Sequence, residues 1–268
     1  MLTILVINSK GGSGKTTLTT NLASYYASRK LRTAIMDYDP QGSSMQWLKI
    51  RPTHVENVQV EKIHGANAAL PKGAGALHSL QAWVPTETEI LIIDAPAGAK
   101  GLLLQELVRK SNFIVIPVAP SPIDIHATAD FIKELFLFGG ARTSKAKIAV
   151  VANRVRSPSS PVYAALERFL NSLKLPFLTS IRDSDNYLQS AEKGLGVFEM
   201  DEATTVAERR ELMPIVKWLN GHFPNRYGSR IGDKTLTLEE SRKFAALRMG
   251  TTQKFPAFST TGRFKSYP

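Results

Sequence analysis

The sequence predicts an α/β fold in which helices cover both faces of a single, mostly parallel β-sheet. Six short apolar runs of strand length are separated by stretches of helix length. The apolar residues in these runs are nearly continuous rather than alternating, which is typical of strands buried on both faces, as in parallel sheets. Strands that alternate with helices along a chain indicate a layered, doubly wound architecture.

The expected elements follow one another along the chain. Strands are expected at residues 2–7, 33–36, 89–93, 113–118, 148–152 and 176–181. Helices are expected at residues 16–28, 102–108, 127–138 and 162–173, because apolar residues recur in each at helical spacing. The mixed segment 49–88 is rich in alanine and glycine, and there we expect one or two helices with loops.

Length and composition restrict the class of protein. The chain has 268 residues and is 43% hydrophobic, which is enough to bury a substantial core. It has no cysteine, and this excludes disulfides, iron–sulfur clusters, thiolate zinc sites and cysteine nucleophiles. No apolar run approaches the roughly 18 residues that a membrane-spanning helix needs. The formal net charge of +11 is compatible with nucleic acid or an anionic membrane surface as a partner.

The positive charge divides the chain into two parts. We expect a domain over residues 1–223 and a basic C-terminal extension over residues 224–268. Residues 226–268 contain nine basic and three acidic residues and so carry +6, while the remaining +5 lies on residues 1–225. The extension has one plausible helix, residues 238–249, with Thr237 as its N-cap, and is otherwise expected to be partly disordered.

A glycine-rich loop, Lys-Gly-Gly-Ser-Gly-Lys-Thr-Thr at residues 10–17, joins the first expected strand to the first expected helix. Glycines let backbone N–H groups surround phosphate oxygens, and the helix N-terminus adds partial positive charge. Lys15 is expected to reach the β- and γ-phosphates, and the Thr16 hydroxyl to bind magnesium. The residues expected to bind the nucleotide are Gly11, Gly12, Ser13, Gly14, Lys15, Thr16 and Thr17.

Acidic residues follow two later strands, at the end where α/β sheets bind their ligands. Asp39, in Asp-Tyr-Asp-Pro-Gln at residues 37–41, is expected to orient the attacking water or to hold magnesium through a water. Asp37 is expected to be structural. Asp94 ends the third strand and is expected to bind a magnesium-bound water. The expected metal site therefore comprises Thr16, Asp39 and Asp94.

The loop departs from the ordinary Walker A pattern, because Ser9 stands at that pattern's first glycine and a second lysine, Lys10, follows it. In these features the chain resembles the deviant Walker A ATPases of the ParA/MinD family, a class of P-loop NTPases. It matches their Lys-Gly-Gly-x-Gly-Lys-Thr pattern at every fixed position. The resemblance implies ATP and Mg²⁺ as cofactors and a homodimer with ATP sandwiched between the chains. It also implies that Lys10 reaches the partner's phosphates, so that Lys10, Lys15 and Asp39 are the catalytic residues.

The resemblance covers about residues 1–220. Asn153, which follows the fifth strand, falls at the adenine-recognising asparagine, whose side-chain amide can both donate to and accept from a base. Ala97 departs mildly from the family's Asp-x-Pro-Pro-Gly pattern. Residues 181–184 and 194–199 resemble the family's Ile-Arg pair and its Gly-x-x-Val-x-Glu segment. No helix-turn-helix precedes the loop, as in the shorter family members.

The resemblance implies an ATPase that positions or partitions a cargo. The ATP-bound dimer is expected to bind nonspecific DNA through lysines and arginines, and an adaptor on the cargo is expected to stimulate hydrolysis. The cargo is expected to be a plasmid, a chromosome or a protein assembly such as a microcompartment. We expect a cytoplasmic protein that associates with the nucleoid when ATP is bound. The expected DNA-binding residues are Arg182, Arg209, Arg210 and Lys217, with Lys145 and Lys147 as a second cluster.

Two alternative functions stay open at this point. A small-molecule, ATP-dependent ligase on the same fold would show ATP turnover that depends on a metabolite and is indifferent to DNA. A MinD-like ATPase would bind membrane through a C-terminal amphipathic helix. Residues 238–249 have an imperfect apolar stripe with acidic residues beside it, so membrane binding is disfavoured.

Overall fold

The computed structural model describes residues 1–55, 58–68, 84–224 and 227. The extension expected over residues 224–268, including its helix at 238–249, lies almost entirely outside the described residues. Its boundary and its structure therefore stay predictions.

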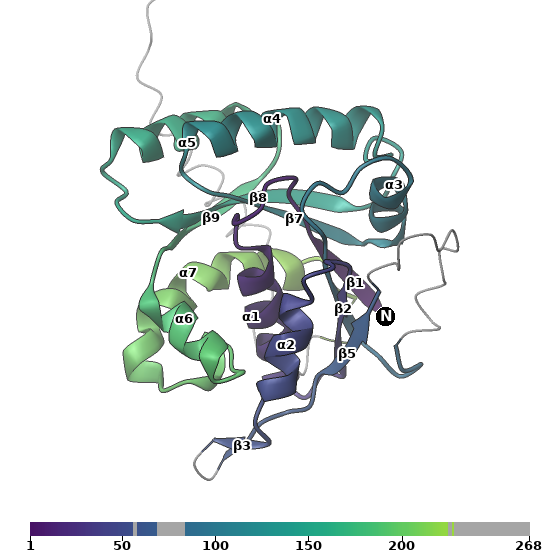
Figure 1. Cartoon of the computed structure of the whole chain (residues 1–268), viewed down its shortest axis with the longest axis vertical. Coiled ribbons are helices and arrows are strands. Elements are labelled where there is room, and N and C mark those ends of the chain that lie inside the picture. The colour runs from purple at the N-terminus through teal and green to yellow at the C-terminus, as the bar shows by residue number, and fades with distance from the viewer. Residues whose placement is uncertain (56–57, 69–83, 225–226, 228–268) are drawn as a thin grey trace, which may run out of the picture. The chain divides into compact units, whose positions relative to one another are not determined.

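The centre of the fold is a seven-stranded sheet with the order β5-β2-β6-β1-β7-β8-β9 (Figure 1). Every neighbouring pair is parallel, as the continuous apolar runs predict. All six expected strands form, so the predicted fold class is confirmed. The strands are β1 (Leu2–Val6), β2 (Thr33–Asp37), β5 (His64–Asn67), β6 (Ile90–Asp94), β7 (Phe113–Val118), β8 (Lys147–Val155) and β9 (Phe177–Arg182).

Helices cover both faces of the sheet, as a doubly wound fold requires (Figure 1). One face carries α1 (Lys15–Ser28), α2 (Ser43–Ile50), α6 (Asp185–Glu192) and α7 (Glu202–Asn220). The other face carries α3 (Gly101–Lys110), α4 (Pro122–Leu137) and α5 (Pro161–Ser172). A short 3-10 helix, Val197–Glu199, precedes α7.

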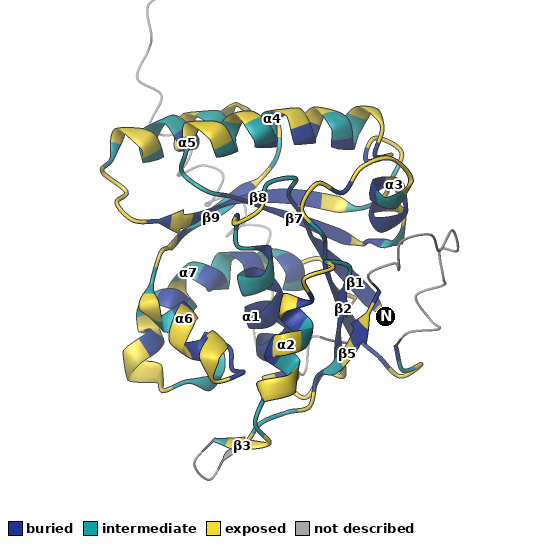
Figure 2. Cartoon of the chain, viewed as in Figure 1, coloured by how far each residue is buried: buried dark blue, intermediate teal, exposed yellow. Residues whose placement is uncertain are grey.

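The central strands are buried on both sides, and Figure 2 shows them almost entirely in the buried class. Alternate residues of β1 enter different cores because successive side chains of a strand point to opposite faces. Ile4 and Val6 pack in the core that contains residues of α1 and α7. Leu5 packs in the core that contains residues of α3, α4 and α5. The central strands are thus held from both sides, which fixes the carboxyl end of the sheet where the loop begins.

The helices expected within residues 49–88 are wrong for the described part of that segment. Helix α2 ends at Ile50, and the chain then forms the antiparallel pair β3 (His54–Val55) and β4 (Val58–Gln59), followed by β5. Strand β5 is an edge strand in which only Ala66 is buried, so it has no apolar run for sequence reasoning to detect.

Helix α4 begins at Pro122, well before the start at residue 127 that the apolar periodicity predicts, whereas α5 begins at Pro161, next to its expected start at residue 162. Each starts with a serine N-cap followed by proline, since Ser121 accepts a bond from the Asp124 N–H (3.1 Å) and Ser160 from the Tyr163 N–H (3.2 Å). Proline suits the first helical position, where its missing N–H costs no helical bond. The first turns of these helices contain no buried residue, so their starts are set by capping rather than by burial.

The segment Gly-Leu-Gly-Val-Phe-Glu at residues 194–199 packs against α1 and α2. Gly194 has a φ of 65°, and a Cβ there would lie 2.6 Å from the backbone of Arg51. A Cβ on Gly196 would lie 1.7 Å from the Ser24 Oγ. Arg51 donates from Nη1 to the Glu199 Oε2 (2.9 Å), and these side chains are only 5% and 7% exposed. The segment therefore serves packing, with a buried ion pair as its main polar contact.

Replacing Glu199 by alanine is expected to lower the free energy of unfolding by about 3–5 kcal/mol, because the Arg51 guanidinium would stay buried without its carboxylate. Urea denaturation followed by circular dichroism measures this loss. The control is Asp130→Ala, which removes an exposed ion pair with Lys133 and should cost less than about 1 kcal/mol. Equal losses in the two variants would contradict the structural role of Glu199.

Candidate nucleotide-binding site

The phosphate loop connects β1 to α1 at the carboxyl end of the central strand. Gly12 and Gly14 have φ values of 77° and 86°, which residues with a side chain rarely adopt. A Cβ on Gly14 would lie only 1.9 Å from the Asn153 Nδ2. Asn153, on β8, donates from Nδ2 to the Ser13 carbonyl oxygen (2.8 Å). The loop is thus fixed by its own glycines and by a side chain from a distant strand.

Asn153 is 3% exposed and lines the nucleotide pocket, but its amide N–H group is directed at the loop. In this structure it positions the loop, a role that sequence reasoning missed. Its contact with adenine stays a prediction.

Lys15 is the most buried cation of the loop, with 7% of its surface exposed. Its Nζ donates to the Lys10 carbonyl oxygen at 3.1 Å. Burial lowers the pKa of Lys15, and the nearby carboxylates of Asp94 and Asp39 oppose this shift. The ammonium therefore lies beside two carboxylates and is bonded to a backbone oxygen that a phosphate oxygen can replace.

Thr16 and Asp94 meet directly, since the Thr16 Oγ1 donates to the Asp94 Oδ2 at 2.9 Å. Burial raises the pKa of Asp94 to about 7; the Thr16 hydrogen bond and Lys15 oppose the shift, and Asp37 and Asp39 add to it. Hydroxyl and carboxylate oxygens are the ligands that Mg²⁺ prefers. The buried Oγ of Ser13 has no hydrogen-bond partner among the described residues. This donor set fits a nucleotide with its magnesium ion.

Asp37, which ends β2, and Asp39, which follows it in the next loop, have different surroundings. Asp37 is fully buried, and its Oδ2 accepts bonds from the Ser44 N–H (3.1 Å) and the Ser44 Oγ (2.7 Å), so it caps the start of α2. Asp39 is partly exposed, and its Oδ1 accepts a bond from the Gln41 N–H at 3.0 Å. The structural role expected for Asp37 agrees with these bonds, whereas Asp39 faces the pocket.

A pocket of about 830 Å³ lies over the loop, which is a volume suited to a small ligand. The structure brings most of the expected nucleotide and metal residues together in its wall: Gly11, Gly12, Gly14, Lys15, Thr16, Thr17, Asp39 and Asn153. Arg182, which is expected to bind DNA, also lines this pocket. Residues of the wall that sequence reasoning missed include Arg154, Arg156, Asp183 and Tyr187.

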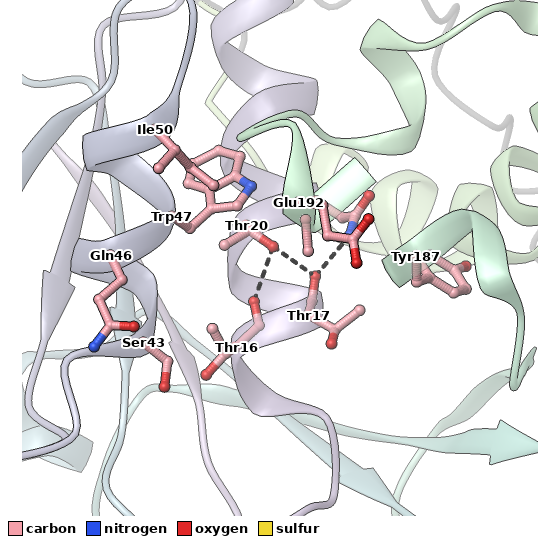
Figure 3. A pocket seen from close by; sticks show the side chains of 11 residues that line it. Thr16, Thr17, Thr20, Ser43, Gln46, Trp47, Ile50, Tyr187 and Glu192 are labelled. Carbon is pink, nitrogen blue, oxygen red and sulfur yellow. Dashed lines mark hydrogen bonds between the residues drawn. The ribbon is translucent and has the colours of Figure 1, made fainter. Parts of the chain in front are cut away.

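A neighbouring pocket of about 450 Å³ lies between α1, α2 and α6 (Figure 3). It shares Thr16, Thr17, Ser43 and Tyr187 with the nucleotide pocket. The Thr20 hydroxyl in its wall donates to the backbone oxygen of Thr16 (3.0 Å), as Figure 3 shows. The nucleotide pocket is thus continued along α1, between this helix and helices α2 and α6.

The family of the chain follows from comparison of its sequence with known proteins. A family model described as the CobQ/CobB/MinD/ParA nucleotide binding domain matches residues 4–197. The chain belongs to this family. The resemblance that the phosphate loop indicates is therefore confirmed, and the loop, Asp39, Asp94 and Asn153 all lie within the matched domain.

Relatives within the ParA/MinD group share both sequence and fold. Maintenance of carboxysome distribution protein A (McdA) of Halothiobacillus neapolitanus is 29% identical over 199 residues, which are 74% of this chain and 87% of that protein. The structure of apo McdA from Cyanothece has a TM-score of 0.63 at 17% identity and covers 82% of this chain and 99% of its own. MinD of Pyrococcus horikoshii, complexed with Mg-ADP, has a TM-score of 0.61 at 16% identity and covers 85% and 98%.

The cations expected to bind DNA in this ParA/MinD chain lie in different surroundings. Arg182 is 50% exposed and donates from Nε to the Glu211 Oε1 at 2.7 Å. Arg209 is largely covered and donates to the carbonyl oxygens of Val197 (3.2 Å) and Met200 (2.7 Å), so it fixes the start of α7.

The remaining cations of this group are exposed. Arg210 and Lys217 lie on α7. Lys145 and Lys147 lie near the start of β8, at the opposite end of that strand from Asn153.

The affinity for Mg-ATP is expected to rise between about pH 6 and pH 8, because the Asp94 carboxyl, with a pKa of about 7, must lose its proton to hold the ion's water shell. Below pH 7 the affinity for Mg-ATP should fall by up to about tenfold for each pH unit. Titration of a fluorescent ATP analogue in Mg²⁺ measures the effect, and Asp94→Asn should remove it.

The pKa of Asp94 in the folded protein lies above its pKa in the unfolded chain. Protonation of Asp94 therefore also stabilises the nucleotide-free fold, and this stability is lost as the pH rises through 7. A flat affinity profile in the wild type would contradict this assignment.

Proposed function

We propose that this chain is an ATPase that uses ATP and Mg²⁺ to position a cargo on DNA. ATP binding drives dimerisation, the dimer binds DNA without sequence preference, and an adaptor on the cargo stimulates hydrolysis and release. The observation that carries this proposal is the two-lysine phosphate loop, in which Lys15 is buried beside Asp94 and Asp39 while Lys10 lies at the start. Its place in the ParA/MinD family supports the same function.

The geometry suits phosphoryl transfer to water, a reaction that needs positioning and charge neutralisation more than covalent chemistry. Lys15 and the loop N–H groups bind the β- and γ-phosphates, and Thr16 and Asp94 hold the magnesium ion. When bound, the ion neutralises charge on the phosphate oxygens. Asp39 orients a water whose oxygen attacks the γ-phosphorus as the bond to the bridging oxygen of ADP breaks. The proton of that water passes to solvent through Asp39 or the phosphate.

Similarity to McdA supports a protein assembly as the cargo. A relative that matches 74% of this chain is named for maintenance of carboxysome distribution, and 87% of its own length is matched. We therefore place a microcompartment ahead of a plasmid or a chromosome as the cargo. A cytoplasmic location with nucleoid association in the ATP state follows from the same proposal. No helix in the described part of the chain is long and apolar enough to span a bilayer.

DNA retention tests this function most directly. With ATP and Mg²⁺, the protein is expected to retard nonspecific duplex DNA at about 50 mM salt, and to release it near 200 mM, since such binding depends on counterion release. ADP should give no retardation. Replacing Arg210 and Lys217 together by alanine should weaken binding at least tenfold, whereas Arg168→Ala, an exposed cation on α5, should not.

The DNA-retention experiment also distinguishes the positioning function from the ligase alternative. A chain that turns over ATP only with an added metabolite, and that shows no ATP-dependent DNA retention, would overturn the positioning function. The MinD-like alternative rests on residues 238–249, which lie outside the described residues. Binding to anionic vesicles that disappears when residues 238–268 are removed would favour it.

A further inference from the structure

The chain between β9 and α6 forms one wall of the nucleotide pocket and is held from behind by α7. We call residues 182–185 the wall segment. All four of them line the pocket, and Tyr187 and Leu188 of α6 continue the wall. Helix α7 packs against β9, the strand that ends at Arg182. The position of this wall therefore depends on contacts made by α7.

The strongest of these contacts joins Arg182 to Glu211 of α7. The Glu211 Oε1 accepts a bond from the Arg182 Nε (2.7 Å), and its Oε2 accepts one from the Arg182 backbone N–H (2.9 Å). The Glu211 side chain is 19% exposed and that of Arg182 is 50% exposed, so water and ligands reach the guanidinium. Bonds between a guanidinium and a carboxylate are charge-assisted and stronger than neutral ones. In this structure the charge of Arg182 is thus already neutralised by α7.

Glu208 holds the same wall segment one turn earlier on α7. Residues three apart on a helix are neighbours on its surface, so Glu208 and Glu211 lie next to each other. Glu208 is 3% exposed, and its Oε1 accepts a bond from the Ser184 Oγ at 2.7 Å. The two carboxylates therefore fasten residues 182 and 184 of the pocket wall to one helix.

Another side of α7 carries cations that face solvent. Arg210 and Lys217 are both exposed, and because they are seven residues apart they lie on one side of the helix. Both are expected to bind DNA, as is Arg182. Arg182 differs from them because it is bonded to Glu211, the residue next to Arg210. The same helix thus offers two cations to DNA and withholds a third.

We infer that Glu211 is a positioning residue that competes with DNA phosphates for the Arg182 guanidinium. A phosphate and a carboxylate bind a guanidinium through the same N–H groups, so one replaces the other. While the pair with Glu211 is intact, Arg182 stays at the nucleotide pocket and adds little to DNA binding. In the ATP-bound dimer, cations of two chains bind one DNA together, and this favours the exchange. The inference rests on the proposed function, because DNA is the competing ligand.

The Glu211→Gln variant tests this competition. Glutamine keeps the size of the side chain and an oxygen that accepts bonds from Arg182, but it removes the charge that holds the guanidinium. With ADP at about 50 mM salt, the variant is expected to bind labelled nonspecific duplex DNA about tenfold more tightly than the wild type. Its affinity should also fall more steeply with salt, by about 0.9 in the logarithmic slope for each bound chain, since one more phosphate is neutralised. Fluorescence anisotropy measures both quantities.

Two further variants separate release of Arg182 from the simple loss of a negative charge. Glu202→Gln removes a carboxylate of the same helix that is 82% exposed, while its neighbour Arg209 stays bonded to backbone oxygens. This variant should change the DNA affinity less than about twofold and leave the salt slope unchanged. Glu211→Gln combined with Arg182→Ala should lose the whole gain. A gain that persists in the combined variant would overturn the inference.

Arg182→Ala alone gives a test that does not depend on how well Glu211→Gln folds. At saturating nucleotide it should weaken DNA binding at least about tenfold with ATP, but less than about twofold with ADP, where Glu211 already neutralises Arg182. Equal losses with the two nucleotides would contradict the competition. If the wild type fails to bind DNA with ATP, the proposed function fails and the inference with it. If the wild type binds and Glu211→Gln matches it in affinity and salt slope, the inference alone fails.

Discussion

Replacing Asp39 by alanine is expected to lower ATP hydrolysis at least about a hundredfold and to leave ATP binding nearly unchanged. Asp39 is partly exposed at the nucleotide pocket, and the loss of a group that orients or deprotonates the attacking water typically costs about 10²–10⁴ in rate. Lys15, Thr16 and Asp94, which bind the phosphates and the ion, are untouched by the change. Phosphate release and binding of a fluorescent ATP analogue measure the two properties.

The matched control is Asp37→Ala, two residues earlier. Asp37 accepts bonds from the N–H and Oγ of Ser44, so its loss should lower the free energy of unfolding by about 1–3 kcal/mol through the start of α2. We therefore expect Asp37→Ala to lose stability, whereas Asp39→Ala should lose activity alone. If Asp39→Ala hydrolyses ATP at the wild-type rate, Asp39 is not the water-orienting residue.

Replacing Gly14 by alanine is expected to lower the free energy of unfolding of the nucleotide-free protein by about 2–4 kcal/mol. The added Cβ would lie 1.9 Å from the Asn153 Nδ2, and the φ of 86° would be strained for alanine. Gly11→Ala is the control in the same loop, because nothing lies within 4 Å of its Cβ position. Chemical denaturation without nucleotide measures both variants.

The partner residue gives a second test of this packing. In Gly14→Ala combined with Asn153→Ala, the clash is removed, so the two losses of stability should not add. The double variant should be more stable than the sum of the single losses predicts. Full additivity, or equal stability of Gly11→Ala and Gly14→Ala, would show that the contact with Asn153 on β8 does not restrict which residue fits at position 14.

The central strands could be predicted because a strand buried on both faces has an uninterrupted run of apolar residues, which is visible in the sequence. Strand β5 could not, since only Ala66 of its residues is buried and its position depends on pairing with β2. The start of α4 was missed for a different reason. Apolar spacing alone assigns its Ser121-Pro122 cap to a loop, although serine before proline is itself a helix-start signal.

The nucleotide loop could be predicted from sequence because its residues are adjacent in the chain. Its glycines are required by the conformation of the loop's own backbone, so the pattern is visible locally. Arg154, Arg156 and Asp183 could not be grouped in this way. They come together because β8 and β9 are neighbours in the sheet, and the order of strands is not a property of local spacing. Arg209 shows a contact that the sequence does not reveal, since its guanidinium donates to the backbone oxygens of Val197 and Met200. Its contact with DNA stays a prediction.

The position of β1 has a consequence for how the chain is made. Strand β1 is synthesised before the other strands of this sheet, but both of its neighbours, β6 and β7, lie far along the chain at residues 90–94 and 113–118. At about 5–20 residues per second, roughly 5–20 s pass before either neighbour has been synthesised. Until then the apolar segment Leu2–Val6 has no sheet to join. A strand that is buried in the finished fold therefore stays unpaired on the nascent chain until residues 90–94 have been made.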